Sequence, residues 1–583
     1  MARPSNHATT RLPDHPPMPT ISDLLRFLYG PRKGDEAARR LLARLAAFRR
    51  EHPKLQQAPP PQQRLTERDA VLITYGDQFR APDEPPLRTL HRFLRAHLGK
   101  SISAVHILPF FPYSSDDGFS VIDYRRVDPH LGSWSDIRAL ERDYRLMFDA
   151  VINHISRQSA WFQGFLRGEA PYTDYFIVVD PRTDLSQVVR PRPWPLLTPV
   201  ETARGTRHVW TTFSTDQIDL NYANPAVLLE IADLLLFYVA RGARIIRLDA
   251  IAYLWKEIGT PCIHLPQTHA VVKLFRAMLD EVAPGVLLIT ETNVPHAENI
   301  AYFGDGHDEA QMVYNFTLPP LTLHALHTGN AERLTAWART LRTPSKATTF
   351  FNFLASHDGI GVRPAEGWLS TAEIEALTAT IRAHGGQVST YTRPDGSQAP
   401  YELNTTWYDA LNNPHHPTPL DVPRFLASQA IMLSLAGVPG IYIHSLFGSS
   451  NCQRCYRQKG QPRALNREKF AYADLQARLS AAGDRAARIL STYRRLLAVR
   501  RRQPAFHPQA AQEVLALHPG VFAVRREAER QTLWALISVQ PRPLRLTLPE
   551  SGLYHDLLSE ETTEHHVTLA PYQVRWLEKR PPR

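Results

Sequence analysis

From residue 70 onward, short apolar runs alternate with longer stretches in which apolar residues recur at helical spacing. The apolar runs have the length of buried strands and start near Val71, Ala104, Arg145, Ala243, Val286, Met312, Thr348 and Pro439. Amphipathic helices are predicted between most of them, over residues 87–98, 226–240, 268–282, 331–341 and 422–435. Eight strands alternating with helices predict an α/β fold, a closed (β/α)8 TIM barrel.

The pattern is different before the barrel, in a lead segment of residues 1–66. Residues 1–20 are rich in proline and polar residues and are expected to be loose. One or two helices should follow, because apolar residues such as Leu41 and Leu45 recur at helical spacing. The prolines at 59–61 mark a linker into the barrel.

The barrel is assigned to residues 67–504. Two gaps are too long for simple loops, so subdomains are expected at about 155–225, after strand three, and at 363–420, after strand seven. The remaining residues, 505–583, are predicted to form a small antiparallel β domain, with short strand-like runs at 521–524, 533–539 and 544–548.

Three of the predicted barrel strands lead into an acidic residue. Strand four runs into Arg247-Leu-Asp249, strand five ends in Glu291, and His357-Asp358 follow strand seven. Residues two apart on a strand project from the same face, and a carboxylate beside a guanidinium stays ionised at neutral pH. A single such pair is more often a salt bridge that closes a strand end. Three acids at the carboxyl ends of barrel strands should meet in one cleft, which suits glycoside chemistry.

Composition narrows the class of protein. A chain of 583 residues with 43% hydrophobic and 21% charged residues is typical of a soluble protein of two to four domains. No apolar run reaches the roughly 18 residues of a membrane span, and the first residues lead into no signal-peptide core. The net charge of +10 comes from scattered arginines, which favours anionic small substrates over nucleic acid.

Three cysteines are too few for a framework of disulfides, which favours a reducing cytoplasm. Cys452 and Cys455 form a C-x-x-C motif, but a metal site would need a second pair and a redox motif a thioredoxin-like unit. The pair is therefore interpreted as incidental. No metal site and no cofactor are predicted.

The motifs at the strand ends resemble those of the α-amylase family of retaining α-glucoside enzymes, over roughly residues 70–580. The matching segments are Asp149-Ala-Val-Ile-Asn-His154, Arg247-Leu-Asp249, Glu291 and His357-Asp358. The resemblance implies that Asp249 is the nucleophile, that Glu291 donates and accepts the proton, and that Asp358 supports the charged transition state. It also implies that Arg247 orients Asp249 and that the sugar is held by Asp77, Tyr124, His154 and His357.

Within that family the chain is similar to the sucrose phosphorylase group, through residues 105–112, 190–193, 356–361 and 466–467. It departs from sucrose phosphorylases where Tyr124 stands in place of histidine, Glu402 in place of glutamine, and Thr292-Asn293 in place of Val-His. Residues 211–225, 262–270 and 441–448 look more like the glucosylglycerate phosphorylases of the same group.

The group resemblance implies that inorganic phosphate cleaves 2-O-α-D-glucosylglycerate to α-D-glucose 1-phosphate and D-glycerate. Arg192 and Tyr401 are expected to bind phosphate, although Arg192 could instead be a surface residue of its proline-rich loop. Arg467 is the expected cation for the glycerate. Glu402 could accept hydrogen bonds from the acceptor or hold an arginine in place.

Other readings stay open. The acceptor could belong to sucrose, sucrose 6-phosphate or glucosylglycerol, because a few loop side chains decide it. A hydrolase or transglucosidase is the next alternative, against which the expected phosphate residues argue. A barrel that serves only as a binding scaffold is disfavoured by the intact set of Asp249, Glu291 and Asp358.

Overall fold

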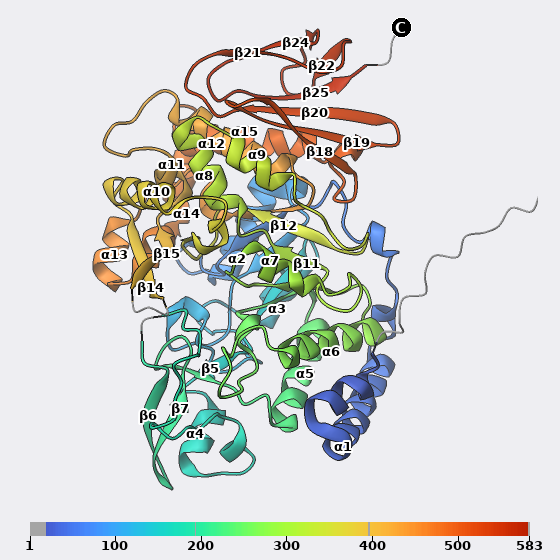
Figure 1. Cartoon of the computed structure of the whole chain (residues 1–583), viewed down its shortest axis with the longest axis vertical. Coiled ribbons are helices and arrows are strands. Elements are labelled where there is room, and N and C mark those ends of the chain that lie inside the picture. The colour runs from blue at the N-terminus through green and yellow to red at the C-terminus, as the bar shows by residue number, and fades with distance from the viewer. Residues whose placement is uncertain (1–18, 193, 394–396, 581–583) are drawn as a thin grey trace, which may run out of the picture.

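The computed structural model describes residues 19–192, 194–393 and 397–580, so most of the expected loose segment 1–20 lies outside the described residues. Eight parallel strands close into a barrel in the order β1-β16-β12-β11-β10-β9-β4-β3 (Figure 1), which confirms the predicted (β/α)8 fold. The strands are β1 (Val71–Thr74), β3 (Ala104–Ile107), β4 (Arg145–Ala150), β9 (Ala243–Leu248), β10 (Leu287–Thr290), β11 (Met312–Tyr314), β12 (Thr349–Phe353) and β16 (Val438–Tyr442).

The barrel strands are apolar along nearly their whole length because both of their faces are covered. Inside the barrel they pack on one another, and outside they pack on helices, so period-two alternation is absent. The covering helices include α2 (Pro86–Phe93), α5 (Pro225–Ala240), α6 (Pro266–Val282), α12 (Asp421–Ser434) and α15 (Arg485–Arg500). The first three begin with proline, whose fixed φ and missing N–H suit the first position of a helix.

Two helices lie between β11 and β12, where the sequence pattern predicted one. They are α8 (Leu318–Thr328) and α9 (Glu332–Ala338). Every residue of α8 from Leu318 to Leu326 is buried, so this helix has no polar face. Its sequence therefore lacks the period of 3.6 residues by which amphipathic helices are recognised.

Two excursions leave the barrel at the carboxyl ends of β4 and β12. The first contains α4 (Ala160–Arg167), the hairpin of β6 (Leu197–Thr202) with β7 (Gly205–Trp210), and the pair of β5 (His154–Ser156) with β8 (Gln217–Asp219). The second contains α10 (Thr371–Ala383) and a sheet of β13 (Ile360–Gly361), β15 (Gln398–Asn404) and β14 (Gln387–Thr392). Both lie over the end of the barrel where the acidic residues emerge.

The lead segment forms the helix α1 (Ile21–Glu51), which begins with a capping box between Thr20 and Asp23 and bends at Gly30. It packs against α5 and α6 on the outside of the barrel (Figure 1). Arg44 donates to the carbonyl of Leu229 and pairs with Asp233, so the contact has a polar rim around its buried leucines.

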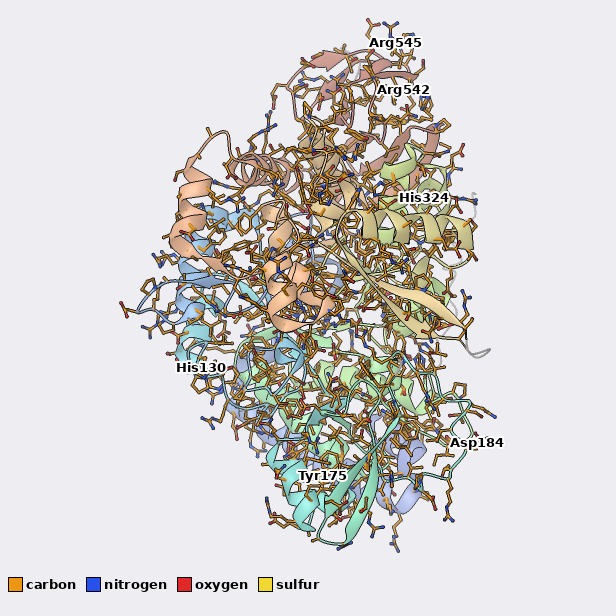
Figure 2. All side chains as sticks on the ribbon, turned by 90° about the vertical axis from the view of Figure 1, so that its left-hand side faces the viewer. His130, Tyr175, Asp184, His324, Arg542 and Arg545 are labelled. Atoms are coloured by element: carbon orange, nitrogen blue, oxygen red, sulfur yellow. A yellow bond between two sulfur atoms is a disulfide. The ribbon has the colours of Figure 1, made fainter. Side chains whose placement is uncertain are left out.

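The C-terminal part is an antiparallel β domain at one end of the long axis. Its six-stranded sheet is ordered β18 (Ala511–His518), β19 (Val521–Ala528), β20 (Gln531–Ser538), β25 (Val574–Lys579), β22 (Tyr554–Asp556) and β23 (Thr562–Thr563). The pair of β21 (Leu544–Thr547) and β24 (His566–Leu569) packs over it. Figure 2 shows Arg542 and Arg545 at this end of the molecule and Tyr175, in the first excursion, toward the other.

The sheet is joined to the barrel by buried polar contacts. Arg526 donates to the carbonyls of Ser434 and His507, and the indole of Trp576 donates to the hydroxyl of Ser434. Burial lowers the pKa of Arg526 to about 9. None of the helices within the described part of the chain is both long enough and apolar enough to cross a bilayer.

Candidate active site

Asp249 and Glu291 lie at the same level on neighbouring strands. Arg247 of β9 is in register with Ile289 of β10, so the residues two positions further along each strand also face each other. The amide of Glu291 donates to the carbonyl of Leu248 and extends this pairing to the strand ends. Neighbouring strands are about 4.8 Å apart, which suits the carboxyl separation of a retaining glycosidase.

Arg247 lies beneath the two acids and is almost fully buried. Its Nη1 donates to Asp249 Oδ1 at 2.7 Å and to Asp149 Oδ1, while Nη2 is 3.7 Å from Glu291 Oε2. Asp149 also contacts His106 Nε2 at 2.7 Å. Burial raises the pKa of Asp249 above its usual range, and the charge of Arg247 opposes that rise. Arg247 therefore holds the carboxylate from below instead of contacting a ligand.

Glu291 has the environment of an acid that exchanges its proton near neutral pH. Its Oε2 accepts a hydrogen bond from the amide of Ala250 at 3.1 Å. Burial, together with the nearby charge of Asp249, raises the pKa of Glu291 to about 7, although Arg247 lowers it. A general acid works best when its pKa is near the operating pH. Ala250 adopts a left-handed conformation, with φ 48°, at the turn that aims this amide.

Asp358 is held from the opposite side of the pocket. Arg463 Nη1 lies 2.7 Å from Asp358 Oδ1, and Arg467 Nη2 lies 3.9 Å from the same oxygen. Burial would raise the pKa of Asp358, but Arg463 and the other nearby positive charges bring it well below its usual range. Asp358 is therefore a permanent anion, in contrast to Glu291.

The two expected histidines also face the pocket. The ring of His357 stacks on Phe119, with 4.5 Å between centroids, and burial lowers its pKa well below the usual value, so it is neutral. His154 Nε2 lies 2.9 Å from the carbonyl of Phe119 and 3.2 Å from the amide nitrogen of Gln217. Both imidazoles are thus fixed in orientation, as ligand-contacting groups must be.

The pocket above these groups gathers residues from both excursions. Its lining includes the expected Asp249, Glu291, Asp358, His154, His357, Arg192, Tyr401 and Glu402. It also includes residues to which the sequence assigned no role, among them Asp116, Phe119, Phe213, Gln217 and Tyr253. Asp116 could have been noticed, because the Asp-Asp-Gly run at 116–118 follows strand two, as acids follow strands four and five.

The mouth of the pocket carries a cluster of opposite charges. Glu402 is buried and accepts two hydrogen bonds from Arg463, at 2.6 and 3.2 Å. Of the two roles considered for Glu402, holding an arginine is the one the structure displays. Arg192 lies 3.8 Å from Glu402 and over the ring of Tyr401, 5.6 Å from its centroid. Arg192 lines the pocket, and no hydrogen bond joins its guanidinium to any described residue.

Four expected site residues do not line this pocket. Arg247 lies beneath it. Tyr124 is buried below His154, where its hydroxyl donates to the carbonyls of Val151 and His154. Asp77 pairs with Lys469 at 2.8 Å and Arg80 at 2.7 Å, because β2 (Phe79–Arg80) pairs with β17 (Phe470–Ala471) and draws the loop aside.

Arg467 is the fourth, and it is buried behind the pocket wall. Its Nη1 lies 3.0 Å from Asp117 and 3.4 Å from Asp116, and its Nε donates to the carbonyl of His357 at 2.8 Å. Arg463, four residues earlier, does lie on the pocket surface, where an arginine that binds glycerate would have to be.

The cysteine pair requires a correction. Cys452 and Cys455, interpreted above as incidental, are joined in a disulfide. The sequence spacing places them one helical turn apart, and the start of α13 (Gln453–Lys459) brings their sulfur atoms together. Cys262 is the remaining cysteine and is buried as a free thiol.

Comparisons with known proteins agree with this geometry. The family profile "Alpha amylase, catalytic domain" matches residues 97–391. A curated protein of Allomeiothermus silvanus, named glucosylglycerate phosphorylase, is 51% identical over 563 residues, covering 96% of this chain and 98% of that protein. The chain belongs to the alpha-amylase family.

Other members of the alpha-amylase family are similar over most of their length. A protein of Escherichia coli K12, also named glucosylglycerate phosphorylase, is 46% identical, covering 88% of this chain and 92% of that protein. The crystal structure of a sucrose 6F-phosphate phosphorylase from Thermoanaerobacter thermosaccharolyticum superposes with a TM-score of 0.72 at 24% identity, covering 86% of this chain and 98% of that one. That structural likeness concerns the fold alone.

Proposed function

We propose that this chain is a glycoside phosphorylase that transfers the glucosyl group of 2-O-α-D-glucosylglycerate to inorganic phosphate, with retention of configuration. The observation that carries the proposal is the guanidinium of Arg192, which lines one pocket with Asp249 and Glu291 and forms no hydrogen bond with any described residue. A planar guanidinium with free donors suits a phosphate or a carboxylate. Relatives that share about half of their residues with this chain are named for the same reaction.

In the first half of the proposed reaction, Asp249 attacks the anomeric carbon and forms a β-glucosyl ester. The bond to the glycerate oxygen breaks, and Glu291, with its pKa near 7, supplies the proton to that oxygen. Asp358 is a permanent anion and stabilises the oxocarbenium-like transition state. His154 and neutral His357 donate or accept hydrogen bonds at the sugar hydroxyls.

In the second half, phosphate enters where glycerate has left. Glu291, now a carboxylate, takes the proton of the attacking phosphate oxygen, and the ester bond to Asp249 breaks to release α-D-glucose 1-phosphate. Phosphate and glycerate occupy the same face of the sugar at different times. One set of cations, Arg192 and Arg463, therefore serves both anions, with Tyr401 as a neighbouring hydroxyl donor.

Glu402 supports an anionic acceptor indirectly. It neutralises part of the charge of Arg463 and keeps the guanidinium in place. The pocket mouth therefore stays cationic, and the Arg463 side chain stays in a fixed position. Five N–H groups are available on a guanidinium, and Arg463 uses three of its own on Asp358 and Glu402. The others are free for a ligand.

Hydrolysis is the second candidate. Any glucosyl ester on Asp249 can be attacked by water, and the pocket opens to solvent at its mouth. Anion-binding residues at that mouth favour phosphate over water, so hydrolysis is expected to be slow. The cytoplasmic location expected from the cysteine content stays a prediction, which fractionation of cells that produce the chain would test.

The reverse reaction tests the function directly. The protein is given α-D-glucose 1-phosphate with D-glycerate, fructose, fructose 6-phosphate or glycerol, and phosphate release is followed for each. We expect fast release with D-glycerate, and an α-linked product by proton NMR. Faster release with one of the other acceptors would refute the glycerate assignment, and release that no acceptor accelerates would indicate a hydrolase. A β-linked product would contradict retention.

A further inference from the structure

The disulfide lies beside the active site and has no part in the reaction proposed above. Cys452 is the residue before α13, and Cys455 lies in the first turn of that helix. The sulfur atom of Cys452 accepts a hydrogen bond from the amide of Cys455 at 3.2 Å. In Figure 1, α13 lies at the edge of the molecule, near β14 and β15 of the second excursion.

The two sulfur atoms differ in access. Cys452 is 7% exposed. Cys455 is half-buried and lines a cavity of about 850 Å³ that is separate from the catalytic pocket. His130, labelled in Figure 2, is exposed on the rim of this cavity. Of the two cysteines, only Cys455 lines this cavity, so it is the one that a small thiol entering the cavity meets.

The same short segment holds one wall of the catalytic pocket. Between Cys452 and Arg467 the chain forms α13 and the turn η11 (Pro462–Asn466). Lys459, at the end of α13, pairs with Asp117 at 2.7 Å, and Arg463 pairs with Asp358 at 2.7 Å. Arg467 then binds the other oxygen of Asp117. Asp117 is adjacent to Asp116, which lines the pocket.

The disulfide is also tied directly to the turn that carries these arginines. The amide of Cys452 donates to the carbonyl of Leu465 at 2.8 Å, midway between Arg463 and Arg467. A cross-link from Cys452 to Cys455 thus fixes the start of α13 against the turn that holds Asp358. Without the cross-link, the start of this seven-residue helix is held by hydrogen bonds and by the ion pair of Arg454 with Glu468 at 3.7 Å.

We propose that Cys452 and Cys455 form a thiol–disulfide exchange site, at which small thiols and disulfides change how firmly the pocket wall of Asp116, Asp117 and Asp358 is held. The affected property is affinity for the glucosyl donor, since Asp116 and Asp358 line the catalytic pocket and the neighbouring Asp117 is held by Lys459 and Arg467 of the same segment. This effect on affinity rests on the proposed function, whereas the exchange chemistry does not.

The exchange proceeds in two balanced steps. A thiolate attacks the sulfur of Cys455, the protein S–S bond breaks, and Cys452 leaves as a thiolate that keeps the hydrogen bond from the Cys455 amide. A second thiolate attacks the mixed disulfide and releases the small disulfide and the thiolate of Cys455. Two small thiols are thereby oxidised to one disulfide, and the protein disulfide is reduced to two thiols.

Glu468 is placed to exchange protons with these sulfurs. One of its carboxylate oxygens lies within 4.8 Å of both sulfur atoms, and no comparable group of three ligand-bearing residues occurs elsewhere in the described chain. Burial raises the pKa of Glu468, against the charge of Arg454. The distance allows this carboxyl group to pass a proton to a departing thiolate.

The experiment equilibrates the full-length protein in mixtures of reduced and oxidised glutathione and traps free thiols with a maleimide for mass spectrometry. The KM for α-D-glucose 1-phosphate is measured at each ratio with D-glycerate as acceptor. We expect KM to be about fivefold or more higher in the reduced protein, with a smaller change in kcat. Cys262→Ser should keep this response, and Cys452→Ser/Cys455→Ser should show the high KM in every mixture.

A second readout separates the site from the proposed function. Hydrogen–deuterium exchange of residues 453–467 should be faster in the reduced protein, whatever the enzyme acts on. If the pair stays reduced in every mixture, there is no exchange site. If the two fully converted forms have equal KM values and equal hydrogen exchange, the link to the pocket wall is refuted. If hydrogen exchange is faster in the reduced protein but no mixture shows catalysis, the thiol–disulfide exchange site is supported and the proposed phosphorylase function is refuted.

Discussion

The guanidinium of Arg463 donates to both oxygens of the Glu402 carboxylate, from Nη2 at 2.6 Å and from Nε at 3.2 Å. This pair is buried, so removing the charge of one member leaves the other incompletely compensated. We expect Glu402→Gln to change the KM for D-glycerate and the KM for inorganic phosphate about tenfold each, because Arg463 serves both anions. Steady-state kinetics of the synthetic and the phosphorolytic reaction measures the two values.

Glu366→Gln is a matched control for this change. Glu366 belongs to the same excursion but is exposed and contacts Tyr391 away from the pocket. Its replacement should leave both KM values unchanged. Unchanged KM values for both anions in Glu402→Gln would contradict the role given to Glu402.

The proton of Glu291 should govern the pH dependence of phosphorolysis. Breaking the bond to glycerate requires protonated Glu291, and its pKa is about 7. The value of kcat/KM for the glucoside should therefore fall about tenfold for each pH unit above 7, because this parameter reports the free enzyme. In Glu291→Gln the remaining activity should show no such descending limb. A wild-type profile that stays flat to pH 9 would contradict the assignment.

The same residue should affect stability in a defined direction. Its folded pKa of about 7 lies above its ordinary value of 4.5, so the folded state binds a proton that the unfolded state has already lost. Stability therefore falls as pH rises from about 4.5 to 7, by on the order of 3 kcal/mol. The melting temperature of Glu291→Gln should exceed that of the wild type at pH 8, and the difference should shrink toward pH 5.

Replacement of the nucleophile should abolish catalysis without harming the fold. Burial raises the pKa of Asp249, which means that its charge is costly in the folded state, and asparagine carries no charge. Arg247 retains Asp149 as a partner. We expect Asp249→Asn to lose activity by a factor on the order of 10⁴ or more. Its melting temperature should be unchanged or higher, and a large decrease would show that the ion pair is needed for folding.

Arg192 should act on anions alone. In Arg192→Ala the KM for phosphate is expected to rise between about tenfold and a hundredfold, the loss typical of one charged hydrogen-bonding partner. The KM for the neutral acceptor glycerol, measured with saturating α-D-glucose 1-phosphate, should be much less affected. Arg190→Ala is the matched control, because Arg190 is two residues away in the same loop and does not line the pocket. Equal losses with phosphate and with glycerol would exclude anion binding as its role.

The barrel was predictable from the sequence to within about a residue at each strand start, because its strands are short apolar runs bounded by polar residues. The acids that follow those strands were predictable for the same reason, because the carboxyl ends of barrel strands meet at one end of the barrel. The helix α8 was not, since a helix that is buried on nearly all sides carries no clear helical period.

The outer parts of the site depend on loops whose paths the sequence does not reveal. Arg463 and Arg467 are four residues apart in one basic segment, and only the turn η11 decides which one reaches the pocket. Asp77 directly follows a barrel strand, yet the pairing of β2 with β17 directs it to Lys469. Tertiary contacts between distant segments determine both outcomes.

The position of α1 has a consequence for synthesis on the ribosome. This helix emerges before any barrel strand, but its contacts at Leu229 and Glu281 are 185 and 232 residues further along the chain. At translation rates of 5 to 20 residues per second, its leucine face waits on the order of 10 to 50 seconds for its binding surface. During that interval α1 is an exposed amphipathic segment, the kind of surface that holding chaperones shield.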